Sequence, residues 1–163
     1  MIKTYGKIPY PLSKIRPVLN DAPGMDKWDT TFKKHEIIET YPKENGMDKV
    51  IVYLYLKMPL FMTDRDIIQE TKVWNEYNGN PNNYLSLMRS TTHSKYPVKE
   101  KPIRAEMVIG GMYLKEISPQ ETLIYMINSL DLKITTGKDI VDSQAPKKGR
   151  DFVDNLIKFL GKN

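Results

Sequence analysis

Apolar and polar residues alternate through much of the middle of the chain, a pattern typical of β-strands that bury one face. From residue 35 to residue 132 the sequence is a series of extended segments, rich in β-branched and aromatic residues and separated by turn clusters. The pattern predicts about seven antiparallel strands. They are residues 2–8, 35–41, 49–57, 65–76, 84–92, 103–115 and 122–132.

Helices are predicted only near the two ends of the chain. After the first strand, Ser13 is suited to cap a short helix over residues 13–19. Pro146 and Gly149 predict a kink or break in the C-terminal helical region. Residues 110–111, two glycines within a strand, predict a bulge. Apolar residues recur every three or four positions at the C-terminal end, as in an amphipathic helix: Phe152, Val153, Leu156, Ile157, Phe159 and Leu160.

The composition predicts one folded α+β domain over residues 1–163. Hydrophobic residues make up 40% of the chain and charged residues 28%, a balance typical of globular proteins. The chain has no cysteine, and His35 and His93 are its two histidines, so we expect no disulfide, metal or cofactor. No apolar run reaches the roughly 20 residues of a membrane span, so we expect a cytoplasmic protein.

A net charge of +5 and a pI near 9.2 favour an anionic partner, either nucleic acid or an acidic membrane surface. The basic clusters at residues 33–35 and 147–150 are short and lack interleaved aromatic residues. We therefore expect no specific nucleic-acid binding, and the default interpretation of these clusters is solvated faces.

Candidate catalytic groups are sparse. His93 and Ser94 are adjacent, but a nucleophile also needs a third group to orient its base. In residues 64–66 an arginine between two aspartates would keep both acids ionised, whereas an acid catalyst needs a raised pKa. The sequence therefore indicates a protein that is not an enzyme.

The loop between the third and fourth predicted strands is unusually apolar. It carries Met58, Leu60, Phe61 and Met62, although a connecting loop is usually polar. One interpretation is that the loop packs on the C-terminal helix as part of the core. The other is a lid whose tip meets a membrane or a lipid.

Five short motifs, taken in order, resemble those of the START domain family, the steroidogenic acute regulatory-related lipid-transfer domains. They are residues 27–29 (KWD), 58–66 (MPLFMTDRD), 103–106 (IRAE), 129–133 (SLDLK) and 152–156 (FVDNL). The resemblance covers nearly the whole chain. It implies a helix-grip fold, in which a curved antiparallel sheet wraps a long C-terminal helix around a tunnel for one lipid. The chain is similar to a minimal version of the family, without the additional N-terminal helix and strands.

Strand parity extends this resemblance to residues of the tunnel. Sterol-binding members of the family place a buried acid and arginine at positions that match Val52 and Thr71, so the resemblance favours a phospholipid or other acyl-chain lipid over a sterol. The inward-facing positions also exclude Lys57, Glu70 and Lys72 from the buried face. The predicted lining is Val50, Val52, Leu54, Leu56, Gln69, Thr71, Val73, Phe152 and Leu156.

The expected function is non-covalent binding and transfer of one lipid, with transient contact to membranes that carry anionic headgroups. Leu60, Phe61 and Met62, together with the C-terminal helix, are the predicted gate and membrane contact. Two alternatives stay open. One is a helix-grip enzyme that uses an acid or base on a bulky apolar substrate, drawn from Tyr113, Glu106 and His93. The other is a lipid-sensing module that controls a protein partner not identified by the sequence.

Overall fold

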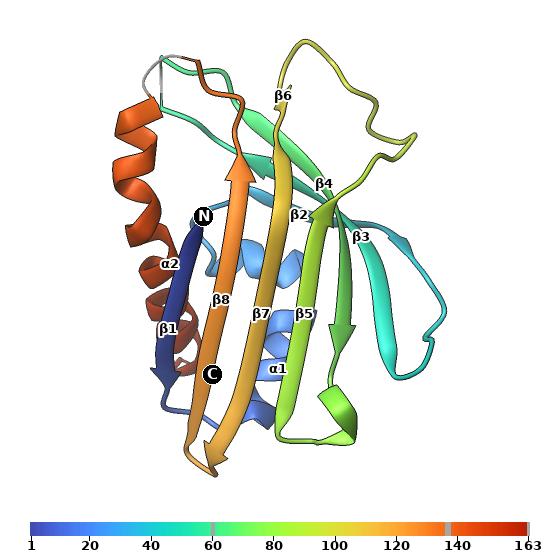
Figure 1. Cartoon of the computed structure of the whole chain (residues 1–163), viewed down its shortest axis with the longest axis vertical. Helices are drawn as coiled ribbons and strands as arrows, with labels where there is room; N and C mark the ends of the chain where they lie inside the picture. The colour runs from blue at the N-terminus through green and yellow to red at the C-terminus, as the bar shows by residue number, and fades with distance from the viewer. Residues whose placement is uncertain (60, 136–137, 163) are drawn as a thin grey trace.

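The structure is a computed structural model that describes residues 1–59, 61–135 and 138–162. One antiparallel sheet lies against helices on a single face, as Figure 1 shows. The elements are β1 (Ile2–Ile8), α1 (Leu12–Asn20), the 3-10 helix η1 (Pro23–Lys27), β2 (Lys34–Thr40), β3 (Met47–Leu56), β4 (Arg65–Trp74), the 3-10 helix η2 (Tyr77–Gly79), β5 (Asn83–Ser90), β6 (Ile103–Arg104), β7 (Glu106–Ser118), β8 (Glu121–Asp131) and α2 (Lys138–Leu160).

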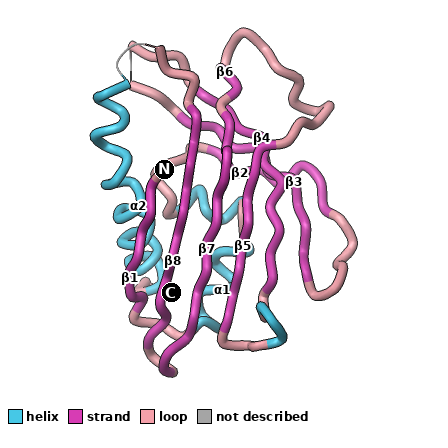
Figure 2. Tube along the Cα trace, viewed as in Figure 1, coloured by secondary structure: helices cyan, strands magenta, loops and turns pink. Residues whose placement is uncertain are grey.

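The strand order is β1-β8-β7-β5-β4-β3-β2, and the short β6 pairs in parallel with β4. The chain therefore forms the predicted α+β helix-grip architecture, with one more short strand than expected. The colours of Figure 2 show the strands as one continuous layer with α1 and α2 on the same side. We call this helix-bearing side the inner face and the opposite side the outer face.

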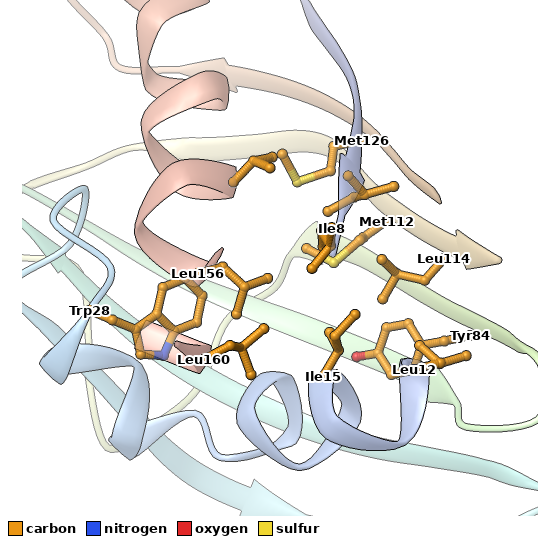
Figure 3. Packing of buried hydrophobic residues seen from close by; sticks show 12 residues of the cluster. Ile8, Leu12, Ile15, Trp28, Tyr84, Met112, Leu114, Met126, Leu156 and Leu160 are labelled. Carbon is orange, nitrogen blue, oxygen red and sulfur yellow. The ribbon is translucent and has the colours of Figure 1, made fainter. Parts of the chain in front are cut away.

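Two clusters of buried residues cover the inner face. The larger one, in Figure 3, joins β1, α1 and α2 to the start of β5, the second half of β7 and the first half of β8. Its fully buried members include Ile8, Ile15 and Leu156. The smaller cluster lies on β3, β4 and the start of β7. The outer face of β3 and β4 is covered by the loop after β5, where Tyr96 stacks on Tyr53 with ring centroids 3.9 Å apart.

Two sequence predictions about the helices are wrong. Ser13 does not cap α1, because the helix begins one residue earlier. The amide of Leu12 instead donates to Glu116 Oε2 at 2.6 Å, so a carboxylate 104 residues away satisfies the free end. Of the kink or break predicted at Pro146 and Gly149, the break is absent, because α2 runs through both residues. Packing on β1 outweighs the lost hydrogen bond of the proline.

The glycines have packing roles. A Cβ at Gly149 would lie 2.1 Å from Thr4 Oγ1, so the glycine lets α2 approach β1 closely. Gly110 and Gly111 lie in regular register with β8, and the irregularities of β7 fall between Met107 and Ile109 and between Glu116 and Ser118. The bulge predicted at residues 110–111 is therefore displaced. A Cβ at Gly110 would come within 3.3 Å of Met107 Sδ, which explains the glycine by crowding.

Candidate functional site

The predicted lining residues of β3 and β4 lie on the inner face. The register places Val50 opposite Thr71 and Val52 opposite Gln69, and antiparallel partners share one face. Thr71 and Val52 are therefore diagonal neighbours, not a directly opposed pair. Buried members of the predicted set are Val52, Leu54, Gln69 and Leu156. Half-buried members are Val50, Leu56, Thr71, Val73 and Phe152.

These residues divide between the two inner clusters. Val73, Phe152 and Leu156 belong to the larger cluster with α1 and β8, whereas Val50, Val52 and Leu54 belong to the smaller one. Figure 3 shows Leu156 pointing from α2 towards Ile8 and Leu160 within this packing. The tunnel lining as a set stays a prediction.

The inner face also carries polar side chains. Gln69 is 7% exposed, and its Nε2 donates to Thr71 Oγ1 at 3.1 Å. Its Oε1 is buried and accepts no hydrogen bond from the described part of the chain. Ser90, opposite Gln69, uses its hydroxyl to accept from the amide of Met107 at 2.7 Å. Sequence parity placed Gln69 inward, but only the tertiary structure shows the unpaired oxygen.

The loop between β3 and β4 is fastened at its base by Asp64. This carboxylate accepts from the Tyr55 hydroxyl at 2.5 Å and from the Met58 amide at 2.8 Å. The bond to Asp64 raises the pKa of Tyr55 to about 12, and the same bond lowers the pKa of Asp64. Met58 is buried, whereas Phe61 is 72% exposed and Met62 half-buried. Leu60, the third predicted gate residue, lies outside the described residues.

Arg65 joins this loop to the segment after β8. The side chain is buried, and its guanidinium donates to the carbonyl oxygens of Thr63, Leu132 and Lys133. Burial lowers the pKa of Arg65. The Leu132 and Lys133 contacts place the loop base beside the connection that leads into α2, as the upper part of Figure 1 shows. Arg65 therefore anchors the base of the loop to the segment that follows β8.

The acids of the Asp-Arg-Asp motif have different partners from those the sequence suggested. Asp66 is paired with Arg104 of β6, at 2.7 Å to Nε and 3.0 Å to Nη2. Arg65 instead binds backbone carbonyls, so it is not the arginine that pairs this acid. The motif is a structural corner that ties β4 to β6.

A buried histidine cluster was missed by the sequence analysis. His35 is buried, with Nδ1 2.6 Å from Asp26 Oδ1 and Nε2 3.4 Å from Asp29 Oδ2. Burial lowers the pKa of His35, but hydrogen bonds to Asp29 and Asp26 raise it by more, so the net pKa is raised. The cluster fastens η1 and the following segment, which carries Trp28, to β2.

The residues considered for the enzyme alternative lie apart. His93 lies in the loop after β5, and its Nε2 is 3.2 Å from Glu39 of β2. Glu106 is paired with Lys133. Tyr113 donates to Asn83 Oδ1 at 3.1 Å. Glu106 and Tyr113 are both on β7, separated by roughly 23 Å at about 3.3 Å per residue. The structure brings no two of these three groups together as an acid and base pair.

A hollow on the outer face is distinct from the predicted lining. It has a volume of about 470 Å³, and its lining includes Gly111 of β7, the strand between β5 and β8. Tyr5, Leu87 and Tyr125 border it and are exposed.

No helix of the described residues is long and apolar enough to cross a membrane.

The family model of the START domain matches residues 1–163. The chain belongs to the START domain family. Membership accounts for the strand order, the position of α2 against the sheet and the inward-facing apolar rows of this START domain. A search of the curated proteins found no match.

Solved structures with the same fold include two human proteins. Human StAR-related lipid transfer protein 5 aligns with a TM-score of 0.82 and 18% identity, covering 98% of this chain and 74% of that one. Human STARD10 aligns with a TM-score of 0.74 and 22% identity, covering 96% of this chain and 63% of that one. This START domain therefore spans less than two thirds of the STARD10 chain.

A bacterial enzyme also shares the fold. The Zhui aromatase/cyclase from Streptomyces sp. R1128 aligns with a TM-score of 0.59 and 11% identity, covering 98% of this chain and 92% of that one. At such identities, the likeness of this START domain to each of these structures concerns the fold alone. The general function that follows from family membership is lipid binding or transfer.

Proposed function

We propose that residues 1–163 form a single domain that binds one lipid between the inner face and α2 and carries it between membranes. The observation that carries this proposal is the inner face itself, where apolar rows from β3 and β4 lie on the same side of the sheet as α2 of this START domain. Val50 and Val73 are only half-buried on that face. Such side chains offer apolar contact to a lipid chain without a covalent step.

The proposed ligand is a phospholipid or another acyl-chain lipid. Val52 and Thr71 occupy the positions where the family resemblance puts an acid and an arginine in sterol-binding members. An apolar and a neutral side chain there favour hydrocarbon, since burial of an unpaired charge is costly.

The proposed gate is the loop of residues 58–64 together with α2. In water the loop is held by Asp64 and Arg65, while Phe61 stays exposed at its tip. At a bilayer the tip would find hydrocarbon, and exposed Lys57 beside it would meet anionic headgroups. The gate therefore opens at the surface where the lipid is exchanged. The proposed location is the cytoplasm, with transient membrane contact.

Native mass spectrometry of the purified chain, with extraction of bound lipid, tests the carrier. A stoichiometric acyl-chain lipid and transfer between vesicles support the proposal. Uptake without transfer favours the lipid-sensing alternative. A chain that takes up no lipid from vesicles contradicts lipid carriage.

Phe61→Asp tests the gate. The change removes an apolar tip and adds a charge that anionic headgroups repel, so we expect transfer to anionic vesicles to slow by about tenfold or more. Val98→Asp is the matched control, because Val98 is 70% exposed against 72% for Phe61 and lies in another loop. Equal transfer rates for both variants, with unchanged melting temperatures, would contradict the gate.

A further inference from the structure

The unpaired oxygen of Gln69 is out of place in a closed apolar interior. Gln69 is more than nine-tenths buried, and its Oε1 has no hydrogen-bond partner in the described residues. Leaving a buried acceptor unpaired is unfavourable, and native structures rarely do so. A ligand that donates to this oxygen would satisfy it.

The neighbours of Gln69 define what such a ligand can be. Val52 stands opposite it, and the buried cluster of Val52, Leu54 and Ile67 adjoins it on the same face. Thr71 accepts from Gln69 Nε2, which leaves the threonine hydroxyl proton free to point elsewhere. A bound hydroxyl group can therefore donate to Gln69 and accept from Thr71.

The charged side chains on the inner face of β3 and β4 already have hydrogen-bond partners. On the inner face of β4 the charged residue is Arg65, at the end of the strand, and its guanidinium is occupied by three carbonyl oxygens. On the same face of β3 the charged residue is Asp48, at the other end, where it accepts from Asn75 Nδ2 at 3.0 Å. Arg65 is therefore not free to neutralise a phosphate beside Gln69, and Asp48 is an anion that would repel one.

We propose that Gln69 Oε1 accepts a hydrogen bond from the polar end of the ligand, and that the ligand is an uncharged acyl-chain lipid with a hydroxyl or amide N–H donor. This inference rests on the proposed function. It narrows the proposed ligand from phospholipids and other acyl-chain lipids to the uncharged acyl-chain lipids. A headgroup without a donor, such as phosphocholine, would leave Oε1 unpaired and would bring a phosphate to the inner face of β3 and β4, where the described cation, Arg65, is already bound to carbonyl oxygens. Within the acyl-chain lipids, the site selects the neutral donor-bearing ones.

Two probes that differ only in the donor test the selection directly. Oleyl alcohol carries the hydroxyl, and oleyl methyl ether has the same chain with the proton replaced by a methyl group. Binding of each to the delipidated full chain is measured by native mass spectrometry titration. We expect the alcohol to bind about tenfold more tightly, the size of one hydrogen bond to a buried group.

Gln69→Leu should abolish this preference, giving a ratio near one, while the unliganded protein stays as stable as before because the unpaired oxygen is gone. Gln69→Met makes the same test with a more flexible side chain, should leucine fit poorly. Gln120→Leu is the matched control, since Gln120 is exposed in the β7–β8 turn. The control should keep the tenfold preference.

The outcomes separate this inference from the proposed function. Equal binding of both probes to the unaltered chain overturns the inference and leaves lipid carriage standing. A preference that survives in both Gln69 variants overturns the role of Gln69. If neither probe binds and no lipid is taken up from vesicles, the proposed function itself fails.

Discussion

Asp64 fastens the base of the loop between β3 and β4, and Tyr55→Phe removes one of its two described contacts. The Tyr55 hydroxyl donates to Asp64 Oδ2 at 2.5 Å, and the Met58 amide donates to Asp64 Oδ1 at 2.8 Å. Without the hydroxyl, the carboxylate is free to rotate away from Met58. The loop should then open more often.

The magnitude follows from the type of bond and its exposure. A hydrogen bond to a charged group contributes about 1.5 to 3 kcal/mol when buried. Tyr55 and Asp64 are both half-buried, so solvent screening reduces the expected contribution to about 1 kcal/mol. One kcal/mol corresponds to roughly a fivefold change in the opening equilibrium.

Amide hydrogen exchange at Met58 measures that opening without reference to any lipid. We expect exchange at this amide to accelerate about fivefold in Tyr55→Phe, and vesicle-to-vesicle transfer to accelerate if gate opening limits it. Tyr113→Phe is the matched control, because it removes a tyrosine bond to Asn83 far along the sheet. Unchanged exchange at Met58 would refute the fastening role of Asp64, whatever the transfer rate.

Leu156→Ala should lower the free energy of unfolding by about 2 to 5 kcal/mol in urea titrations, because Leu156 is fully buried where α2 meets the larger cluster; a loss below 1 kcal/mol would contradict that packing. The raised pKa of His35 means that protonation stabilises the fold below the ordinary pKa of 6.5, and that this contribution is lost as pH rises through the folded-state pKa. Urea midpoints should therefore fall from pH 6 to pH 8 more steeply in the unaltered chain than in His35→Gln, and parallel profiles would argue against the aspartate contacts.

Local pattern and family motifs predicted much of the fold. Alternation identified β1 at residues 2–8, and the three-and-four spacing identified the C-terminal part of α2. Both patterns involve residues that are close together in sequence, so they can be recognised without knowledge of the rest of the chain. The motif resemblance to START domains then supplied the helix-grip arrangement, and the family match confirmed it.

Long-range partners could not be predicted in this way. The cap on Leu12 comes from Glu116, and the partner of Asp66 is Arg104 on β6. His35 lies nine residues from Asp26, yet nothing in that spacing indicates that the two side chains meet inside the fold. Each of these pairs depends on strand register and on which segment crosses which face.

The sequence by itself determined the strands, the apolar face of the last helix and the parity that turns Gln69 inward. Only the tertiary structure decided that Gln69 would be buried with an oxygen unpaired and that Arg65 would be occupied by carbonyl groups. The physical reason is that periodicity fixes the direction of a side chain locally, whereas hydrogen-bond satisfaction depends on every group that packing brings near it.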